Sequence, residues 1–281
     1  MSLNELLMSL DLGLIYGIIA IGIYLSFRIL NFTDLTCDGS FVLGSATSSI
    51  LIKLGFSPIL AIMMSCLAGG CAGLVTAFLN LRFKINDLLS GILVAFMLYS
   101  LNLRIMGGQP NLVLFDNKTI FTGLNSLYIL SIISISIILL IAYLLQTDFG
   151  LGLRSIGQNK RLAVNNGISI PKMTLIGLSL SNGLIAFGGG LFSQHQEFSD
   201  VGSGFGTIII GLASIIIGEK CFQNRSLWVS ILSCVFGSIL YRLFISIALH
   251  SDALGLESSD LNLITGLLIT SIMILSRRRP C

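Results

Sequence analysis

Long apolar runs without charged residues constrain this chain more than any other feature of its sequence. They form nine segments, at about residues 12–30, 38–52, 57–81, 87–106, 126–146, 173–193, 206–218, 226–249 and 261–276. About 20 apolar residues in a helix are enough to cross the hydrocarbon core of a bilayer. Only 10% of the 281 residues are charged, against about 25% in a soluble domain. The sequence therefore predicts an all-α, polytopic membrane protein with about 8–9 transmembrane or half-membrane helices.

Two of these segments, 38–52 and 206–218, are expected to be too short to cross a bilayer alone. Each follows a polar break, RILNFTDLTCDGS before the first and SQHQEFSDVGSG before the second. Polar backbone at membrane depth is tolerated only where protein buries it or where it lines a watery cavity. Paired, interrupted apolar segments are also the best sequence indication of a transport pathway. We therefore expect two broken helices that line or gate a route through the membrane.

The candidate pathway residues lie in and beside the two breaks. They are Asp34, Thr36, Asp38, Ser40, Glu197 and Asp200. Carboxylates near the bilayer are costly and mark pathways or ion pairs. Asp34 and Asp38 are four residues apart, so a helix would place both on one face. An alternative for Asp38 and Ser40 is capping of the second helix, and Thr36 and Ser40 have the alternative of bonding the backbone of their own helix.

Two further features of the breaks leave alternatives open. The tetrapeptides at 32–35 and 198–201, FTDL and FSDV, resemble each other, which is compatible with an inverted repeat. Arg242 is the one basic residue inside a predicted span, and it either extends toward the outer headgroups or pairs with Glu197 or Asp200. His195, between two glutamines, is interpreted as part of a polar lip.

The distribution of basic residues predicts the orientation. With the N-terminus outside and nine crossings, the outer side receives Lys53, Arg104 and Lys118. The cytoplasmic side then receives Arg28, Arg82, Lys84, Arg154, Lys160, Arg161, Lys172, Lys220, Arg225, Arg277, Arg278 and Arg279. An excess of Lys and Arg in cytoplasmic loops is what the positive-inside rule describes. We therefore expect a multi-pass protein of the cell (inner) membrane, with its N-terminus outside and its C-terminus in the cytoplasm.

The whole chain, 1–281, is predicted to be a single membrane domain, and residues 147–172 form its one long predicted cytoplasmic loop. The sequence contains no P-loop, zinc-protease, hydrolase or kinase motif, so it does not hydrolyse ATP by itself. The six cysteines show no metal-binding spacing, and we expect no metal, no cofactor and no enzymatic activity. If transport is ATP-driven, a separate subunit must dock, and 147–172 is the only sizeable landing site.

Four motifs in this order resemble one transporter family. They are DLTCDGSF at 34–41, LYSLNLRIMGGQPN at 98–111, the loop TDFGLGLRSIGQNKRLAVNNGI at 147–168, and the stretch 180–219 around FGGGLFSQHQEFSDVGSG. The chain resembles permeases of the branched-chain amino acid/ribose-type ABC importers, most of all their tryptophan/tyrosine-type branch. Ala163, Gly167, Ile168 and Pro171 resemble the short cytoplasmic coupling helix of such importers.

The resemblance implies a permease subunit of an ATP-driven importer that receives a small solute from an extracytoplasmic binding protein. It implies a cytoplasmic ATP-binding subunit and a second permease copy, forming a homodimer, as partners within the lipid bilayer, and no nucleic acid. ATPase movement would enter through Arg154, Asn159, Arg161, Ala163 and Gly167, although the basic residues among these also suit a purely topological role. An amino-acid substrate is the expectation. Alternatives are an ion-coupled secondary transporter, a membrane-embedded enzyme and a channel.

Overall fold

The computed structural model describes residues 3–115, 117–222, 226–249, 266 and 270. Most of the ninth predicted segment, 261–276, and the arginines at 277–279 lie outside the described residues. Within the described part, seven helices are long and apolar enough to cross a membrane. The predicted all-α, polytopic fold is confirmed.

The elements follow the predicted apolar segments closely. In chain order they are α1 (Leu3–Tyr24), the π-helical turn η1 (Leu25–Ile29), α2 (Thr36–Lys53), α3 (Pro58–Phe83), α4 (Asp87–Ile105), β1 (Asn111–Val113), α5 (Ser126–Gln146), α6 (Asp148–Gln158), α7 (Lys160–Asn165), α8 (Ile170–Gln196), β2 (Phe198–Asp200), the 3₁₀ turn η2 (Val201–Gly204), α9 (Thr207–Cys221) and α10 (Leu227–Leu249). Both predicted breaks are present, one between η1 and α2 and one between α8 and α9.

One length prediction is wrong. The seventh segment was expected to be too short to cross a bilayer, yet α9 continues to Cys221 and η2 extends its start. Together Val201–Cys221 make a candidate span of 21 residues. The Gly and Ser residues at 202–204 form a tight 3₁₀ turn, and Phe205 and Gly206 separate this turn from α9. By contrast, α2 is not among the seven candidate spans.

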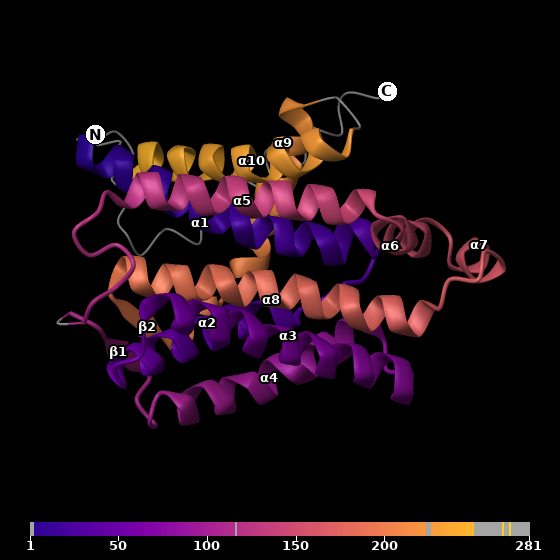
Figure 1. The fold of residues 1–281 in the computed structure, drawn as a ribbon, viewed down its shortest axis with the longest axis horizontal. Coiled ribbons are helices and arrows are strands. Elements are labelled where there is room, and N and C mark those ends of the chain that lie inside the picture. The colour runs from indigo at the N-terminus through magenta and orange to yellow at the C-terminus, as the bar shows by residue number, and fades with distance from the viewer. Residues whose placement is uncertain (1–2, 116, 223–225, 250–265, 267–269, 271–281) are drawn as a thin grey trace.

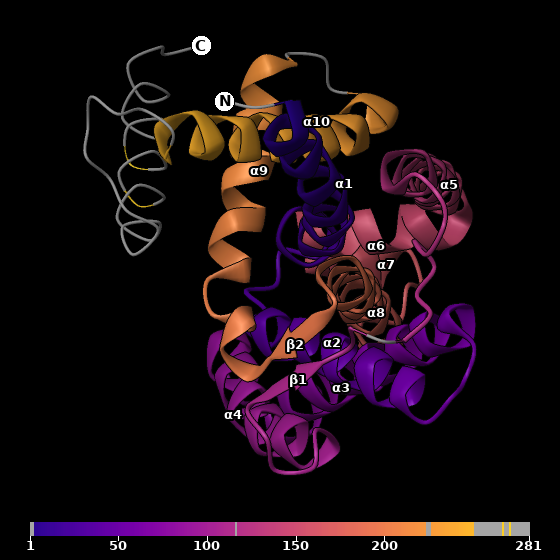
Figure 2. The same cartoon turned by 90° about the vertical axis from the view of Figure 1, so that its left-hand side faces the viewer.

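α8 runs through the middle of the bundle, with α1 on one side and α2 and α3 on the other (Figure 1). α10 packs against α1 and α9 (Figure 2). The predicted loop 147–172 forms α6 and α7 at one end of the bundle, and the antiparallel pair β1–β2 lies at the opposite end (Figure 1). The first break begins beside α6, where Gly157 meets Ile29, and the second begins with β2 at the opposite end of the bundle (Figure 1).

Glycine residues bring α2 and α3 into backbone contact with α8. A Cβ atom at Gly44 of α2 would collide with the carbonyl group of Ala186, and one at Gly73 of α3 would collide with the carbonyl group of Leu178. Small residues permit such close helix packing in membrane proteins, where van der Waals contact replaces the hydrophobic driving force. α2, which begins directly after the first break, is consequently held tightly against α8.

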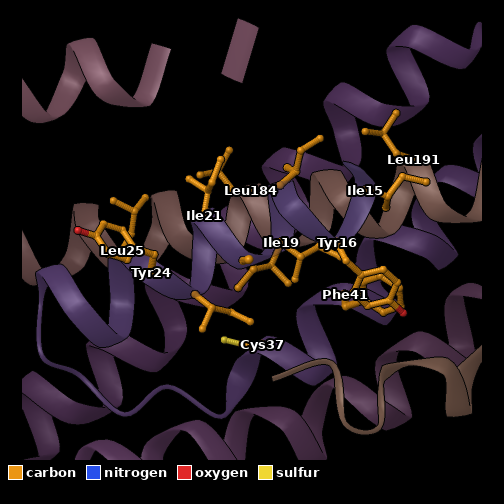
Figure 3. Close-up of a cluster of buried hydrophobic side chains, with 14 of the residues drawn as sticks. Ile15, Tyr16, Ile19, Ile21, Tyr24, Leu25, Cys37, Phe41, Leu184 and Leu191 are labelled. Carbon is orange, nitrogen blue, oxygen red and sulfur yellow. The ribbon is translucent and has the colours of Figure 1, made fainter. Parts of the chain in front are cut away.

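The apolar core lies where α1 meets α2 and α8 (Figure 3). Tyr16 of α1 lies 6.1 Å from Phe41 of α2, and Phe41 lies 5.3 Å from Phe192 of α8, measured between ring centroids. Aromatic pairs at these separations stabilise a core beyond the area that they bury. This cluster fixes α2 in the interior of the bundle, immediately after the first break.

Candidate functional site: the first helix break and the cavity beside it

The first break begins where α1 changes from an α-helix to the π-helical turn η1. The backbone N–H of Phe32 donates to the carbonyl oxygen of Ser26 at 2.9 Å, and Asn31 has a left-handed backbone with φ of 53°. Single π turns inside helices are frequent at functional sites. After this turn the chain runs without helix to residue 35, and Asp34 lies in this non-helical stretch.

Asp34 is fully buried and joins the break to α8. Its Oδ1 atom accepts a hydrogen bond from the backbone N–H of Thr36 at 2.9 Å, at the start of α2. Its Oδ2 atom accepts a hydrogen bond from the side-chain amide of Asn182 in α8 at 2.6 Å. A buried carboxylate needs such partners, because water cannot solvate it. Asp34 therefore stabilises the first turn of α2 and its position against α8.

Asn182 extends this network to the other polar residues of the break. Its Oδ1 atom accepts a hydrogen bond from Ser40 at 2.7 Å. Thr36 shares a hydrogen bond of 2.7 Å with Thr76 of α3. All five residues, Asp34 included, are buried, and we call them the Asn182 network. Thr36 and Ser40 thus bond to neighbouring helices. Asn182 was not among the predicted site residues, although an asparagine in an apolar span was a usable signal.

Asp38 faces a different helix. Its Oδ1 atom accepts a hydrogen bond from the backbone N–H of Ile208 at 2.9 Å, and its Oδ2 atom accepts one from Gly206 at 3.4 Å. Both donors belong to the start of α9, where free N–H groups favour a negative charge. The suggested capping of α2 by Asp38 is wrong, because α2 already starts at Thr36. The predicted common face with Asp34 is also wrong, because Asp34 precedes the helix.

A cavity of about 420 Å³ opens beside Asp38. It lies between the start of α2, the middle of α4 and the η2 turn, on the side of the bundle where α9 and α4 both lie (Figure 2). Residues in its wall include Asp38, Phe96, Tyr99, Asn102, Val201 and Phe205. Asp38 is the only one of the six predicted pathway residues in this wall.

The second break is shaped by backbone pairing and a turn. β2 pairs with β1, with Ser199 opposite Leu112. Glu197 is exposed with φ of 59°, and Asp200 accepts a hydrogen bond from the backbone N–H of Gly202 at 2.6 Å. Asp34 bonds the N–H two residues ahead in the same way. The two similar tetrapeptides therefore form the same local turn, each at the start of a helical segment.

Arg242 and His195 have partners that the sequence did not suggest. The guanidinium carbon of Arg242 lies 4.0 Å from the ring centroid of Tyr16, a cation–π contact, so the structure does not show the suggested pairing with Glu197 or Asp200. His195 lies 3.1 Å from the carboxylate of Asp11, measured from Nε2 to Oδ2, and Ser126 donates to the same oxygen. This cluster joins α1, α5 and α8 and is largely buried.

The sequence-predicted coupling residues gather at the opposite end from β1–β2. Asn159 caps α7, its Oδ1 atom accepting hydrogen bonds from the backbone N–H groups of Arg161 at 3.0 Å and Leu162 at 3.2 Å. Ala163 is buried, whereas Arg161 is exposed. Gly167 ends the loop with φ of +76°, and a Cβ atom there would meet no atom within 4 Å. The tip of α7 is thus a small, defined and open surface.

α6 connects this surface to the first break. A Cβ atom at Gly157 would collide with the carbonyl oxygen of Ile29, the last residue of η1. Leu30 and Leu153 both lie against Gly177 of α8. Arg154 is half-buried, and its Nε atom has no hydrogen-bond partner among the described residues. A displacement of α6 would therefore act directly on Ile29 and Leu30, the residues at which the break begins.

Metal binding finds no support in the described part of the chain. No group of three or more His, Cys, Asp or Glu side chains there could hold a metal ion. The cysteines that the structure describes are free thiols: Cys37, Cys66, Cys71, Cys221 and Cys234.

A family model gives these features a common context. The model described as "Branched-chain amino acid transport system / permease component" matches residues 6–276. The chain belongs to this family of ABC transporter permeases. The resemblance noted in the sequence is thereby confirmed, and the family is one of transport permeases and not of enzymes.

Relatives and a solved structure agree with the assignment. The permease is 40% identical over 262 residues to a tyrosine transport system permease protein of Clostridioides difficile, which covers 93% of this chain and 88% of the relative. It is 27% identical to the branched-chain amino acid transport permease protein LivH of Methanocaldococcus jannaschii, over 76% of this chain and 74% of the relative. A solved ABC transporter in an inward-facing conformation shares the fold, with a TM-score of 0.51 and 15% identity over 98% of this chain and 85% of that one.

Family membership also defines the general setting of the permease. It is a multi-pass membrane protein. The permeases of ABC transporters function with an ATP-binding subunit and a substrate-binding protein. The energy source that the sequence lacks is therefore supplied by another polypeptide.

Proposed function

We propose that the permease imports an amino acid, with an aromatic one such as tyrosine as the first candidate, and that it does so as a homodimer. The 40% identity to a tyrosine transport permease supports the choice of substrate. The aromatic side chains and the carboxylate beside the cavity suit the same class of solute. The observation that carries the proposal is the contact of α6 with the first break, because it connects the exposed surface of α7 to the interior of the bundle.

The orientation that we propose places α6 and α7 in the cytoplasm and the N-terminus outside. Arg154, Lys160 and Arg161 all lie at the end of the bundle formed by α6 and α7. Arg28, at the end of η1, and Arg82, at the end of α3, come to the side that the positive-inside rule predicts to be cytoplasmic. β1–β2, at the opposite end, would then face the binding protein.

α7 and its flanks would receive the movement of the ATPase. Leu162 and Val164 are each 55% exposed beside Arg161, and they offer an apolar surface without a partner within the described residues. The buried Ala163 and the cap formed by Asn159 hold α7 in shape, and Gly167 permits the turn back toward α8. Arg154 on α6 would take part in relaying the motion to Ile29 and the break.

The predicted pathway residues divide into three roles. Asp38 would border the route itself, because it lies in the wall of the cavity. Asp34, Thr36 and Ser40 would hold the break in position through the Asn182 network. Glu197 and Asp200 would shape the outer break, through a left-handed residue and a capped turn. A buried network of this kind has few alternative arrangements, so it suits an element with discrete states.

Uptake by the reconstituted importer tests the proposed function. Proteoliposomes containing the permease, its ATP-binding subunit and its binding protein should accumulate radiolabelled tyrosine only with internal ATP. Replacing the P-loop lysine of the ATP-binding subunit should abolish uptake, because that lysine contacts the nucleotide phosphates. A matched preparation with the wild-type ATPase is the control. Uptake that persists with the lysine variant and follows a proton or sodium gradient would support the secondary-transporter alternative instead.

A further inference from the structure

The wall of the cavity beside Asp38 is mostly apolar, yet it contains one carboxylate. That carboxylate, on Asp38, is only partly buried. A carboxylate facing lipid is costly, so such residues face a bundle interior, a partner or a water-filled cavity. The volume of about 420 Å³ lies within the range of about 300–1,000 Å³ that is usual for small-molecule sites.

Two polar side chains, those of Asp38 and Asn102, belong to the wall of this cavity. Asn102 of α4 is 1% exposed, and its Nδ2 atom donates to the carbonyl oxygen of Gly39 at 3.3 Å, next to Asp38 in the chain. Its Oδ1 atom has no hydrogen-bond partner among the described residues. Buried polar atoms without a partner are rare and call for an explanation. A ligand with several donors would satisfy this acceptor and the neighbouring carboxylate together.

An ammonium group matches the charge and the donor requirement of these two residues. It carries three donors and no acceptor, whereas Asp38 and the free Oδ1 atom of Asn102 supply only acceptors. The second oxygen of Asp38 is weakly engaged, since its distance to the N–H of Gly206 is 3.4 Å. That oxygen is thus available to a charged donor, while the shorter bond of 2.9 Å to Ile208 keeps the carboxylate in place.

Aromatic side chains make up the remainder of the wall. Phe96, Tyr99 and Phe205 are 74%, 47% and 76% exposed, respectively, and all three border the cavity. Rings in this arrangement offer faces and edges to another aromatic ring, and such pairs add to the energy of area burial. The wall therefore combines one carboxylate with three aromatic rings.

We propose that this cavity binds an aromatic amino acid in transit, with its ammonium group between Asp38 and Asn102 and its ring against Phe96, Tyr99 and Phe205. This inference rests on the proposed function and adds the residues that contact the solute. It also predicts the order of importance of the ligand groups. The ammonium group and the ring are recognised, and the carboxylate is not the main determinant.

Ligand analogues test this assignment on the permease–ATPase complex in lipid nanodiscs without nucleotide. The dissociation constants of tyrosine, tyramine and 3-(4-hydroxyphenyl)propionate are measured by saturation-transfer NMR; the last compound lacks the ammonium group. Asp38→Asn should weaken tyrosine and tyramine binding about tenfold or more, because a charge-assisted hydrogen bond is lost. It should change the propionate constant by less than about twofold. Asp87→Asn, a carboxylate replaced at the other end of α4, is the matched control.

Each other outcome overturns the assignment. If wild-type complex binds neither tyrosine nor tyramine, the cavity is not a site for these ligands. If Asp38→Asn weakens all three ligands equally, Asp38 acts only by holding the start of α9. ATP-dependent tyrosine uptake by the wild-type importer would remain intact in either case. Failure of that uptake, by contrast, would overturn the proposed function itself.

Discussion

Gly167→Arg is expected to abolish ATP-driven uptake while the permease still inserts and folds. Gly167 ends the α7 loop with φ of +76°, and no atom lies within 4 Å of a Cβ atom placed there. The substitution therefore adds a long cationic side chain to the surface where the ATPase is proposed to dock, without a clash inside the bundle. A residue with a Cβ atom in this left-handed backbone costs about 1–2 kcal/mol. The loop is therefore expected to change its path toward α8.

The measurement is co-purification of the ATP-binding subunit with the permease, together with tyrosine uptake. Both should fall to background in Gly167→Arg, at unchanged abundance in the membrane. Gly123→Arg is the matched control, because Gly123 has nearly the same φ, +78°, and equally open surroundings, yet lies in the loop that leads into α5 at the other end. If Gly167→Arg retains both ATPase binding and uptake, the coupling role of this loop is wrong.

Asp34→Asn is expected to reduce uptake about tenfold or more with normal abundance. The carboxylate of Asp34 accepts hydrogen bonds from Thr36 and from the side-chain amide of Asn182, at 2.9 and 2.6 Å. Asparagine has one acceptor oxygen, so its own amide group would face the amide of Asn182, donor against donor. A buried donor without an acceptor costs about 1–3 kcal/mol. A cost of about 1.4 kcal/mol corresponds to a tenfold change in a conformational equilibrium.

Exchanging the two side chains provides the decisive comparison. Asn182→Asp alone would place two carboxylates against each other and should be at least as harmful as Asp34→Asn. The double variant restores one donor facing one acceptor and leaves an acceptor for Ser40, so its uptake should exceed that of either single variant. Such a double-mutant cycle isolates the pairwise interaction. Unchanged kinetics in Asp34→Asn, or no recovery in the double variant, would show that this bond has no role in transport.

The positions of the helices and breaks could be predicted from the sequence because hydrocarbon imposes a simple length rule. A span needs about 20 apolar residues, so Pro58–Phe83, Asp87–Ile105 and Ser126–Gln146 stand out as uninterrupted runs. The breaks are visible because polar backbone is excluded from lipid. The length of α9 was misjudged, since the glycines at 202–206 suit an open loop and a 3₁₀ turn equally well.

The partners of the polar residues could not be predicted, because they lie far away in the sequence. Asp38 bonds to Ile208, 170 positions away, and Asp34 bonds to Asn182, 148 positions away. No local pattern specifies such pairs. The sequence therefore indicated that the breaks were important, but not that Asp34 is a structural member of the Asn182 network while Asp38 borders a cavity.

The contacts of α9 connect the two breaks mechanically. At its start, α9 is held by Asp38 from the first break. Near its end, Glu219 pairs with Arg28, which lies in the last turn of η1. α6 in turn contacts Ile29. A push on α6 would therefore reach α9 through η1, and the η2 turn that precedes α9 lines the cavity.

The accessibility of the cavity during the ATPase cycle tests the central claim most directly. The variant Tyr99→Cys is made in a permease whose natural cysteines have been replaced. Tyr99 is 47% exposed in the cavity wall. A charged, lipid-insoluble thiol reagent is then applied to the reconstituted importer. If the cavity is a watery route driven by the ATPase, labelling should occur, and its rate should change about tenfold or more between the nucleotide-free and the ATP-trapped states, as expected for two conformations separated by a few kcal/mol. Absence of labelling in every state, or the same rate with and without ATP, would contradict the account.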